Sequence, residues 1–138
     1  TIKEGMGLEK RDILGYSPLT LAYIGDGIYE LVIRTLVVNK ANTSAKNLHR
    51  MSSSLVKAQT QAQMAHELSE ELTEEEMKVY KRGRNAKSAT MAKNATMSDY
   101  RAATGFEALM GYLYLTEQSE RMMELIRMGL HSVERRAK

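Results

Sequence analysis

The sequence predicts an all-α fold, and three observations lead to this class. Helix-forming residues dominate the composition, with one Pro, one Phe and no Trp among 138 residues. Apolar residues recur at steps of three, four and seven, which is the spacing of one helix face. No stretch alternates apolar and polar residues as a strand would. The length suits one core and leaves no room for an added module of about 70 residues, so we expect a single domain over residues 1–138.

The first half of the chain predicts three helices. The first ends near residue 39, and the stripe that we expect to face the core consists of Leu21, Ile24, Ile28, Leu31 and Val38. A neighbouring face of the same helix carries Ala22, Asp26, Glu30 and Ile33. Residues 41–44 are expected to form a turn, in which Asn42 or Thr43 caps a second helix that runs to about residue 52. A third helix follows over residues 54–68.

The second half predicts three more helices. Thr73 and Glu76 form a capping box, which places a helix start at Glu74 and makes the acidic run before it a favourable helix N-terminus rather than a binding site. Beyond Tyr80 the apolar pattern fades, so residues 81–88 are expected to form a basic loop. Ser98 is the expected cap of the next helix, and a turn over residues 116–119 leads into the last one.

Composition excludes several classes of site. The chain has no Cys, so disulfides, thiolate metal sites and thiol nucleophiles are excluded. The three histidines lie at positions 49, 66 and 131, without the spacing of zinc ligands. The longest uncharged run covers residues 13–25, contains Pro18 and is too short to span a membrane. No basic-then-apolar leader precedes this run. We therefore expect a soluble cytoplasmic protein without a membrane partner.

Two of the predicted helices each carry one acid among apolar and small residues, namely Asp26 and Glu107. The glycines that flank these acids are Gly25, Gly27, Gly105 and Gly111. Each glycine costs a helix interior roughly 1 kcal/mol relative to alanine, so we expect close backbone approach there. Crossing at small residues would bring the two carboxylates together, and paired carboxylates bind Mg²⁺. Structural roles, as a helix-crossing carboxylate for Asp26 and a buried salt-bridge partner for Glu107, remain alternatives.

Positive charge is concentrated in one part of the chain. The net charge is only +3, but residues 81–101 hold six bases against Asp99 alone. The side chains that we expect to contact RNA phosphate and sugar are Lys81, Arg82, Arg84, Asn85, Lys87, Ser88 and Lys93. The expected loop has no aromatic residue to stack an unpaired base, which favours duplex over single-stranded RNA. A solvated loop without a ligand is the alternative.

Three motifs resemble one enzyme family. Residues 23–30 read Tyr-Ile-Gly-Asp-Gly-Ile-Tyr-Glu and resemble the signature of ribonuclease III catalytic domains. Residues 106–115 read Phe-Glu-Ala-Leu-Met-Gly-Tyr-Leu-Tyr-Leu and resemble the second acidic motif of that family. Residues 81–88 look like the basic loop of mini-ribonuclease III, the bacterial branch without an appended double-stranded-RNA-binding domain. The likeness to this branch extends over nearly the whole chain.

The resemblance implies an all-helical homodimer with a ribonuclease III-type endonuclease fold and no separate RNA-binding domain. Its two active sites would each cut one strand of an RNA duplex with Mg²⁺, or Mn²⁺ in its place, and leave 5′-phosphate and 3′-hydroxyl ends. Asp26 and Glu107 match the catalytic, metal-binding pair of the family. Ala22 and Thr104 stand where the longer enzymes carry two further carboxylates, which implies weaker metal binding with more ligands from water or RNA phosphate.

The same resemblance implies that the substrate is precursor 23S ribosomal RNA, whose ends the branch matures. Without a second binding domain, the affinity for bare duplex is expected to be low, and a helper such as a ribosomal protein would supply further contacts. Two other hypotheses stay open. One is a non-catalytic RNA-binding or ribosome-associated module of the same fold, and the other is a dimerisation adaptor that uses Met-rich helix faces. Glu30 is either an outer-shell group of the site or a partner in a helix salt bridge.

Overall fold

The computed structural model describes residues 1–86 and 96–137. The elements are α1 (Ile2–Gly5), the short 3-10 turn η1 (Ile13–Gly15), α2 (Pro18–Lys40), α3 (Ala45–Val56), α4 (Ala58–Leu68), α5 (Glu74–Asn85), α6 (Met97–Leu115) and α7 (Ser119–Ala137). In these two ranges no strand occurs, which confirms the all-α prediction. Within the same ranges, no helix is long and apolar enough to cross a membrane.

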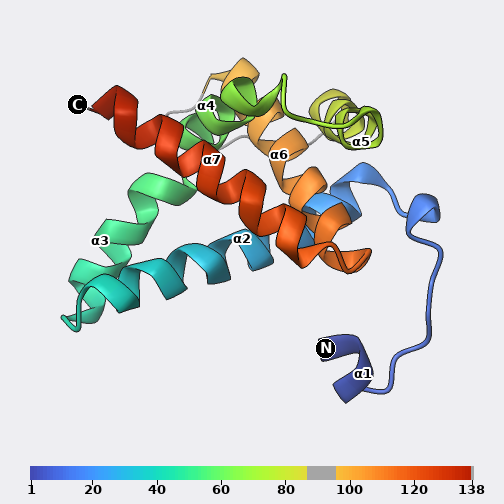
Figure 1. The fold of residues 1–138 in the computed structure, drawn as a ribbon, viewed down its shortest axis with the longest axis horizontal. Coiled ribbons are helices and arrows are strands. Elements are labelled where there is room, and N and C mark those ends of the chain that lie inside the picture. The colour runs from blue at the N-terminus through green and yellow to red at the C-terminus, as the bar shows by residue number, and fades with distance from the viewer. Residues whose placement is uncertain (87–95, 138) are drawn as a thin grey trace.

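α6 is the central helix of the bundle (Figure 1). It packs against α2, α4, α5 and α7, so most of its length is buried. The largest fully buried side chains include Tyr29, Ile33, Met64, Phe106, Leu109, Met110, Leu113, Met122 and Leu125. Tyr29 meets Phe106 edge to face with ring centroids 5.2 Å apart, an arrangement that the aromatic quadrupole favours. The core therefore lies between α2, α4, α6 and α7.

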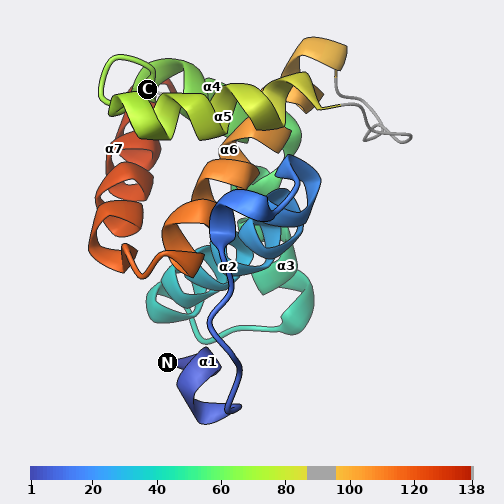
Figure 2. The ribbon, with the colours of Figure 1, turned by 90° about the vertical axis from the view of Figure 1, so that its right-hand side faces the viewer.

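The N-terminal segment projects from one end of the bundle, as Figure 2 shows. Its contact with the bundle includes a hydrogen bond of 3.1 Å from Lys3 Nζ to the carbonyl oxygen of Leu115 at the end of α6. A second long-range link lies between α5 and α7. The Arg121 guanidinium donates to both carboxylate oxygens of the buried Glu76, with 2.9 Å for each bond. These links hold the ends of the helices to the bundle.

The buried face of α2 differs from the predicted one. Leu21 is buried as expected, but Leu31 and Val38 are 57% and 56% exposed, so their assignment to the core was wrong. The buried residues of α2 are Leu21, Ala22, Gly25, Tyr29, Ile33 and Val37. This face contains small residues and a tyrosine because α6 approaches it closely. The large aliphatic residues that dominate the sequence pattern lie partly on the other side of the helix.

Two of the predicted caps are displaced by one or two residues. Ser44, rather than Asn42 or Thr43, caps α3, because its hydroxyl accepts from the Asn47 amide at 3.2 Å. Thr96, rather than Ser98, caps α6. Its hydroxyl accepts from the Asp99 amide at 3.0 Å, which leaves Ser98 inside the first turn. The break between α3 and α4 falls at Lys57 alone, a few residues later than predicted.

α5 confirms one prediction and corrects another. Thr73 and Glu76 form the expected capping box, and the helix begins at Glu74. The helix then continues to Asn85, so the first five residues of the predicted basic loop are helical. Gly83 explains the difference, because a Cβ there would lie 2.7 Å from the Cβ of Ala108 on α6. Gly83 lets α5 pack closely against α6. The buried face of α5 therefore continues past Tyr80, although no apolar side chain there predicts it from the sequence.

Candidate active site

α2 and α6 cross with their backbones in direct contact. A Cβ built on Gly25 would lie 1.7 Å from the carbonyl oxygen of Glu107, and one on Gly111 would lie 1.9 Å from that of Leu21. These two glycines confirm the predicted close crossing, since no larger residue fits at either position. The other two glycines have different surroundings. Gly27 has no atom within 4 Å of its Cβ position, and Gly105 packs against Tyr80 of α5 instead of α2.

The crossing brings the carboxyl groups of Asp26 and Glu107 together. Asp26 follows Gly25 on the exposed side of α2, and Glu107 is partly buried on α6. Burial raises the pKa of Glu107 to about 8, helped by a hydrogen bond with Asp26 and by the charge of Asp26. Two carboxyl groups brought together in this way form a site that favours a bound cation.

Two buried side chains adjoin Glu107, and neither was identified from the sequence. The Gln61 amide on α4 donates to Glu107 Oε2 at 3.3 Å, which lowers the pKa of Glu107 in opposition to the burial. The Tyr29 hydroxyl is also buried, and both its burial and the charge of Glu107 raise its pKa. A signal for Gln61 exists in the sequence, because it shares the spacing of the apolar residues Met64 and Leu68 on one helix face.

The two positions at which the family resemblance led us to look for further carboxylates, Ala22 and Thr104, supply none. Ala22 is buried, and the Thr104 hydroxyl is engaged with the Tyr100 carbonyl oxygen at 3.0 Å. Among the residues that the structure describes, no three His, Cys, Asp or Glu side chains gather in a metal-binding group. Glu30 forms an ion pair of 3.0 Å with Arg34 one turn further along α2. The site therefore consists of two acids.

These residues fit a hard divalent cation held by few protein ligands. Mg²⁺ prefers oxygen ligands and keeps several waters when it binds, so one or two carboxylates are a usual protein contribution. Burial and the neighbouring Asp26 both raise the pKa of Glu107, and a bound cation would offset the cost of its charged form. Water and RNA phosphate oxygens would complete the coordination.

Four of the seven predicted RNA-contact residues lie at the C-terminal end of α5. Lys81, Arg82 and Asn85 are exposed, and the Arg84 guanidinium lies 5.7 Å from the centre of the Tyr80 ring, as a cation–π pair does. The remaining three predicted residues, Lys87, Ser88 and Lys93, lie outside the described residues.

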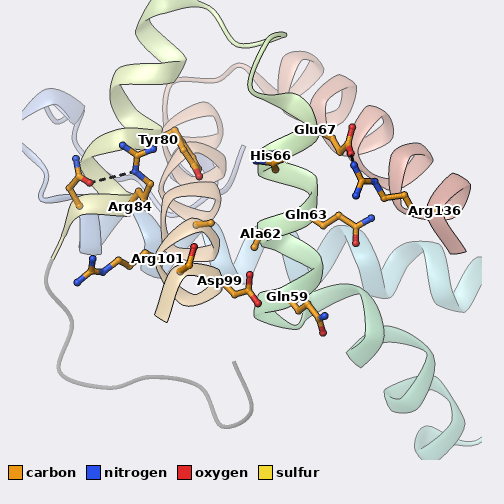
Figure 3. Close-up of a pocket in the computed structure, with 13 residues that line it drawn as sticks. Gln59, Ala62, Gln63, His66, Glu67, Tyr80, Arg84, Asp99, Arg101 and Arg136 are labelled. Atoms are coloured by element: carbon orange, nitrogen blue, oxygen red, sulfur yellow. Dashed lines mark hydrogen bonds and ion pairs between the residues drawn. The ribbon is translucent and has the colours of Figure 1, made fainter. Parts of the chain in front are cut away.

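A polar groove of about 730 Å³ opens beside the end of α5 (Figure 3). Arg84 and Asn85 line it together with Arg101 of α6. Across the groove, Glu67 of α4 forms an ion pair with Arg136 of α7. No sequence pattern indicates Arg136 here, because residues so far apart in the chain meet only through the packing of the helices.

Comparisons with known proteins identify the family to which this chain belongs. Residues 19–118 match the model of the ribonuclease III domain family. A mini-ribonuclease 3 of Clostridium tetani is 46% identical over 131 residues, which cover 94% of this chain and 87% of that protein. A mini-ribonuclease 3 of Enterococcus faecalis is 53% identical over 118 residues, covering 84% of this chain and 89% of that one.

A solved structure adds evidence for the fold. The crystal structure of a Fusobacterium nucleatum protein superimposes with a TM-score of 0.79 at 30% identity, and the match covers 88% of this chain and 98% of that one. The chain therefore belongs to the ribonuclease III family, in its mini-ribonuclease 3 branch, and is an endoribonuclease of that type.

Proposed function

We propose that Asp26 and Glu107 are the catalytic pair of a Mg²⁺-dependent endonuclease that cuts double-stranded RNA. The observation that carries this proposal is the meeting of two carboxyl groups at the crossing of α2 and α6, where the pKa of Glu107 is raised to about 8. A buried carboxylate beside a second acid is costly unless a cation compensates the charge. Membership of the ribonuclease III family supports the same pair.

The reaction is the hydrolysis of a phosphodiester bond. A water oxygen bonds to phosphorus, the bond from phosphorus to O3′ breaks, and O3′ takes up a proton, which leaves a 5′-phosphate and a 3′-hydroxyl. When bound, Mg²⁺ would supply neutralisation of the phosphate charge and a lowered pKa for the attacking water. Asp26 and Glu107 would hold this ion, with Mn²⁺ as a substitute. Glu107 also accepts a hydrogen bond of 3.3 Å from the Gln61 amide at Oε2.

RNA binding is assigned to the basic end of α5 and the residues that follow it. Lys81, Arg82 and Asn85 are exposed there, and Arg84 is partly exposed at the groove. Lys87, Ser88 and Lys93 complete the proposed set from the sequence. Side chains of this kind contact phosphate and sugar oxygens and recognise a duplex by its shape rather than its sequence.

We further propose that the chain acts as a homodimer on precursor 23S ribosomal RNA, each site cutting one strand, with the single helical domain carrying both binding and catalysis. Exposed apolar side chains on α2 support the dimer, since Tyr23 is 82% exposed and Leu31 and Val38 are also more than half exposed. A ribosomal protein that presents the RNA would add contacts to those made by this domain.

The decisive experiment incubates the wild type, Asp26→Asn and Glu107→Gln with a labelled RNA duplex and with its separate strands, in Mg²⁺ and in chelator. We expect the wild type to cut only the duplex, only with Mg²⁺, and both variants to bind RNA while cutting is reduced by at least about 100-fold. Normal turnover by either variant would refute the assignment of that residue. Binding without cutting by the wild type, on precursor ribosomal RNA as well as on generic duplex, would support a non-catalytic RNA-binding module instead.

A further inference from the structure

The corner between α3 and α4 is held by three side chains that approach one helix end. Only Lys57 separates the two helices, so the last carbonyl groups of α3 need donors from outside the helix. The three donors and their acceptors are the Tyr29 hydroxyl to Leu55 O at 2.7 Å, the Thr60 hydroxyl to Ser54 O at 2.6 Å and the Gln61 amide to Val56 O at 2.8 Å. Each side chain donates to one carbonyl oxygen in the last turn of α3.

Gln61 is the one of these three whose side chain also bonds a carboxylate of the candidate site. Its Nε2 donates to Val56 O and to Glu107 Oε2, so both of its N–H groups are used. Because the Val56 carbonyl oxygen can only accept, the amide nitrogen must face it and cannot be exchanged with the amide oxygen. Gln61 is only 2% exposed, and its Oε1 is buried with no hydrogen-bond partner in the described part of the chain. An unpaired amide oxygen is costly, so capping α3 alone is a poor explanation for a glutamine here.

We propose that Gln61 is a positioning residue that holds the Glu107 carboxylate toward Asp26, with the end of α3 as its anchor. The bond to Val56 fixes the amide plane, and the second N–H group then fixes Glu107 Oε2. Partners of this kind orient metal-binding carboxylates from outside the coordination shell. This inference rests on the proposed function, because it assumes that Glu107 binds the metal.

The hydrogen bond from Gln61 to Glu107 matters because the site offers few protein ligands for a metal. Ala22 and Thr104 supply no carboxylate, so a metal would depend on Asp26 and Glu107 alone for its protein ligands. A glutamate has three rotatable side-chain bonds, and each unfixed bond lowers the fraction of molecules in which both carboxylates face one ion. A buried amide that restricts Glu107 therefore has a larger effect here than in a site with four acids.

The test compares Gln61→Met with Thr60→Val. Methionine keeps the length of the side chain and removes both N–H groups. Thr60→Val is the matched control, because it also removes one buried donor to the end of α3 but touches neither acid. The readouts are Mn²⁺ binding to RNA-free protein, followed by electron paramagnetic resonance, and the Mg²⁺ concentration that gives half-maximal cutting of duplex RNA.

We expect both variants to lower the melting temperature, and only Gln61→Met to weaken Mn²⁺ binding and raise the Mg²⁺ requirement, each by about tenfold. Equal metal dependence of the two variants would overturn the proposal and leave Gln61 as a cap of α3. Gln61→Asn is a second variant, because its shorter amide cannot reach both partners. It should show the same weaker Mn²⁺ binding, and it decides the question if Gln61→Met does not fold.

The experiment separates this inference from the function on which it rests. Wild-type protein that neither binds Mn²⁺ nor cuts duplex RNA would overturn the proposed function and the role of Gln61 together. Wild-type protein that does both, with Gln61→Met and Gln61→Asn matching Thr60→Val, would overturn the role of Gln61 alone.

Discussion

At the scale of single residues, Glu107 is a group whose chemistry opposes stability. Its pKa rises from 4.5 to about 8 in the folded protein because of burial, the hydrogen bond with Asp26 and the charge of Asp26. The folded state therefore keeps this proton longer than the unfolded state does, and metal-free stability falls as the pH rises from about 4.5 to about 8. We predict that Glu107→Gln raises the melting temperature in chelator at pH 8.5 and changes it little at pH 5.

The control for this prediction is Glu30→Gln, another acid that stands next to the site on α2. Glu30 belongs to a solvent-exposed ion pair with Arg34, and such pairs contribute at most about 1 kcal/mol. Its replacement should therefore have a small effect at both pH values. A loss of stability for Glu107→Gln that is equal at both pH values would contradict the burial argument.

At the scale of elements, the crossing of α2 and α6 requires glycine at Gly25 but not at Gly27. An alanine at Gly25 would place its Cβ 1.7 Å from a backbone oxygen of α6, so the helices must separate. We predict that Gly25→Ala destabilises the fold by at least about 3 kcal/mol in denaturant titrations. Gly27→Ala is the control, because open space at Gly27 and better helix propensity predict a gain of up to about 1 kcal/mol. Equal effects of the two would show that the helices do not touch there.

The C-terminal end of α5 carries the element-scale prediction for RNA. Lys81 and Arg82 are exposed, so Lys81→Ala with Arg82→Ala should leave the fold intact and weaken duplex binding. The slope of log K against log salt should become shallower by about 0.9 for each phosphate that the variant no longer neutralises. The control removes two exposed charges from α7, as Arg127→Ala with Arg135→Ala. An unchanged slope in the α5 variant would refute its role in binding phosphate.

At the scale of the whole molecule, the exposed apolar side chains on α2 predict self-association. Tyr23, Leu31 and Val38 are each more than half exposed on the helix that carries Asp26, and exposed apolar patches of this kind mark interfaces. We expect analytical ultracentrifugation to give twice the 15.6 kDa mass of one chain. Tyr23→Arg should shift the mass to that of one chain, and Met123→Arg, on α7, should not. A monomeric wild type would refute the dimer.

The sequence anticipated most of the fold because its signals are local. The steps of three, four and seven residues predict helices, and the capping box of Thr73 and Glu76 gives the start of α5 to the residue. Ser44 and Thr96 cap their helices one or two residues from the predicted positions, because several neighbouring polar residues are equally good candidates. The sequence singles out the two acids because each is isolated among small and apolar residues, and the structure brings their carboxyl groups together. Their role as the catalytic pair stays a prediction.

The sequence by itself determined the helical class, the approximate order of the helices and the two acids, because helix periodicity, capping and isolated charge depend on neighbouring residues. Only the tertiary structure decided which face of α2 is buried, how far α5 extends and which side chain holds Glu107. Gly25 and Gly83 place backbones against α6, and Gln61 lies 46 positions from Glu107. These contacts form between helices that are far apart in the chain. They depend on how the helices pack, and a local sequence pattern does not encode that packing.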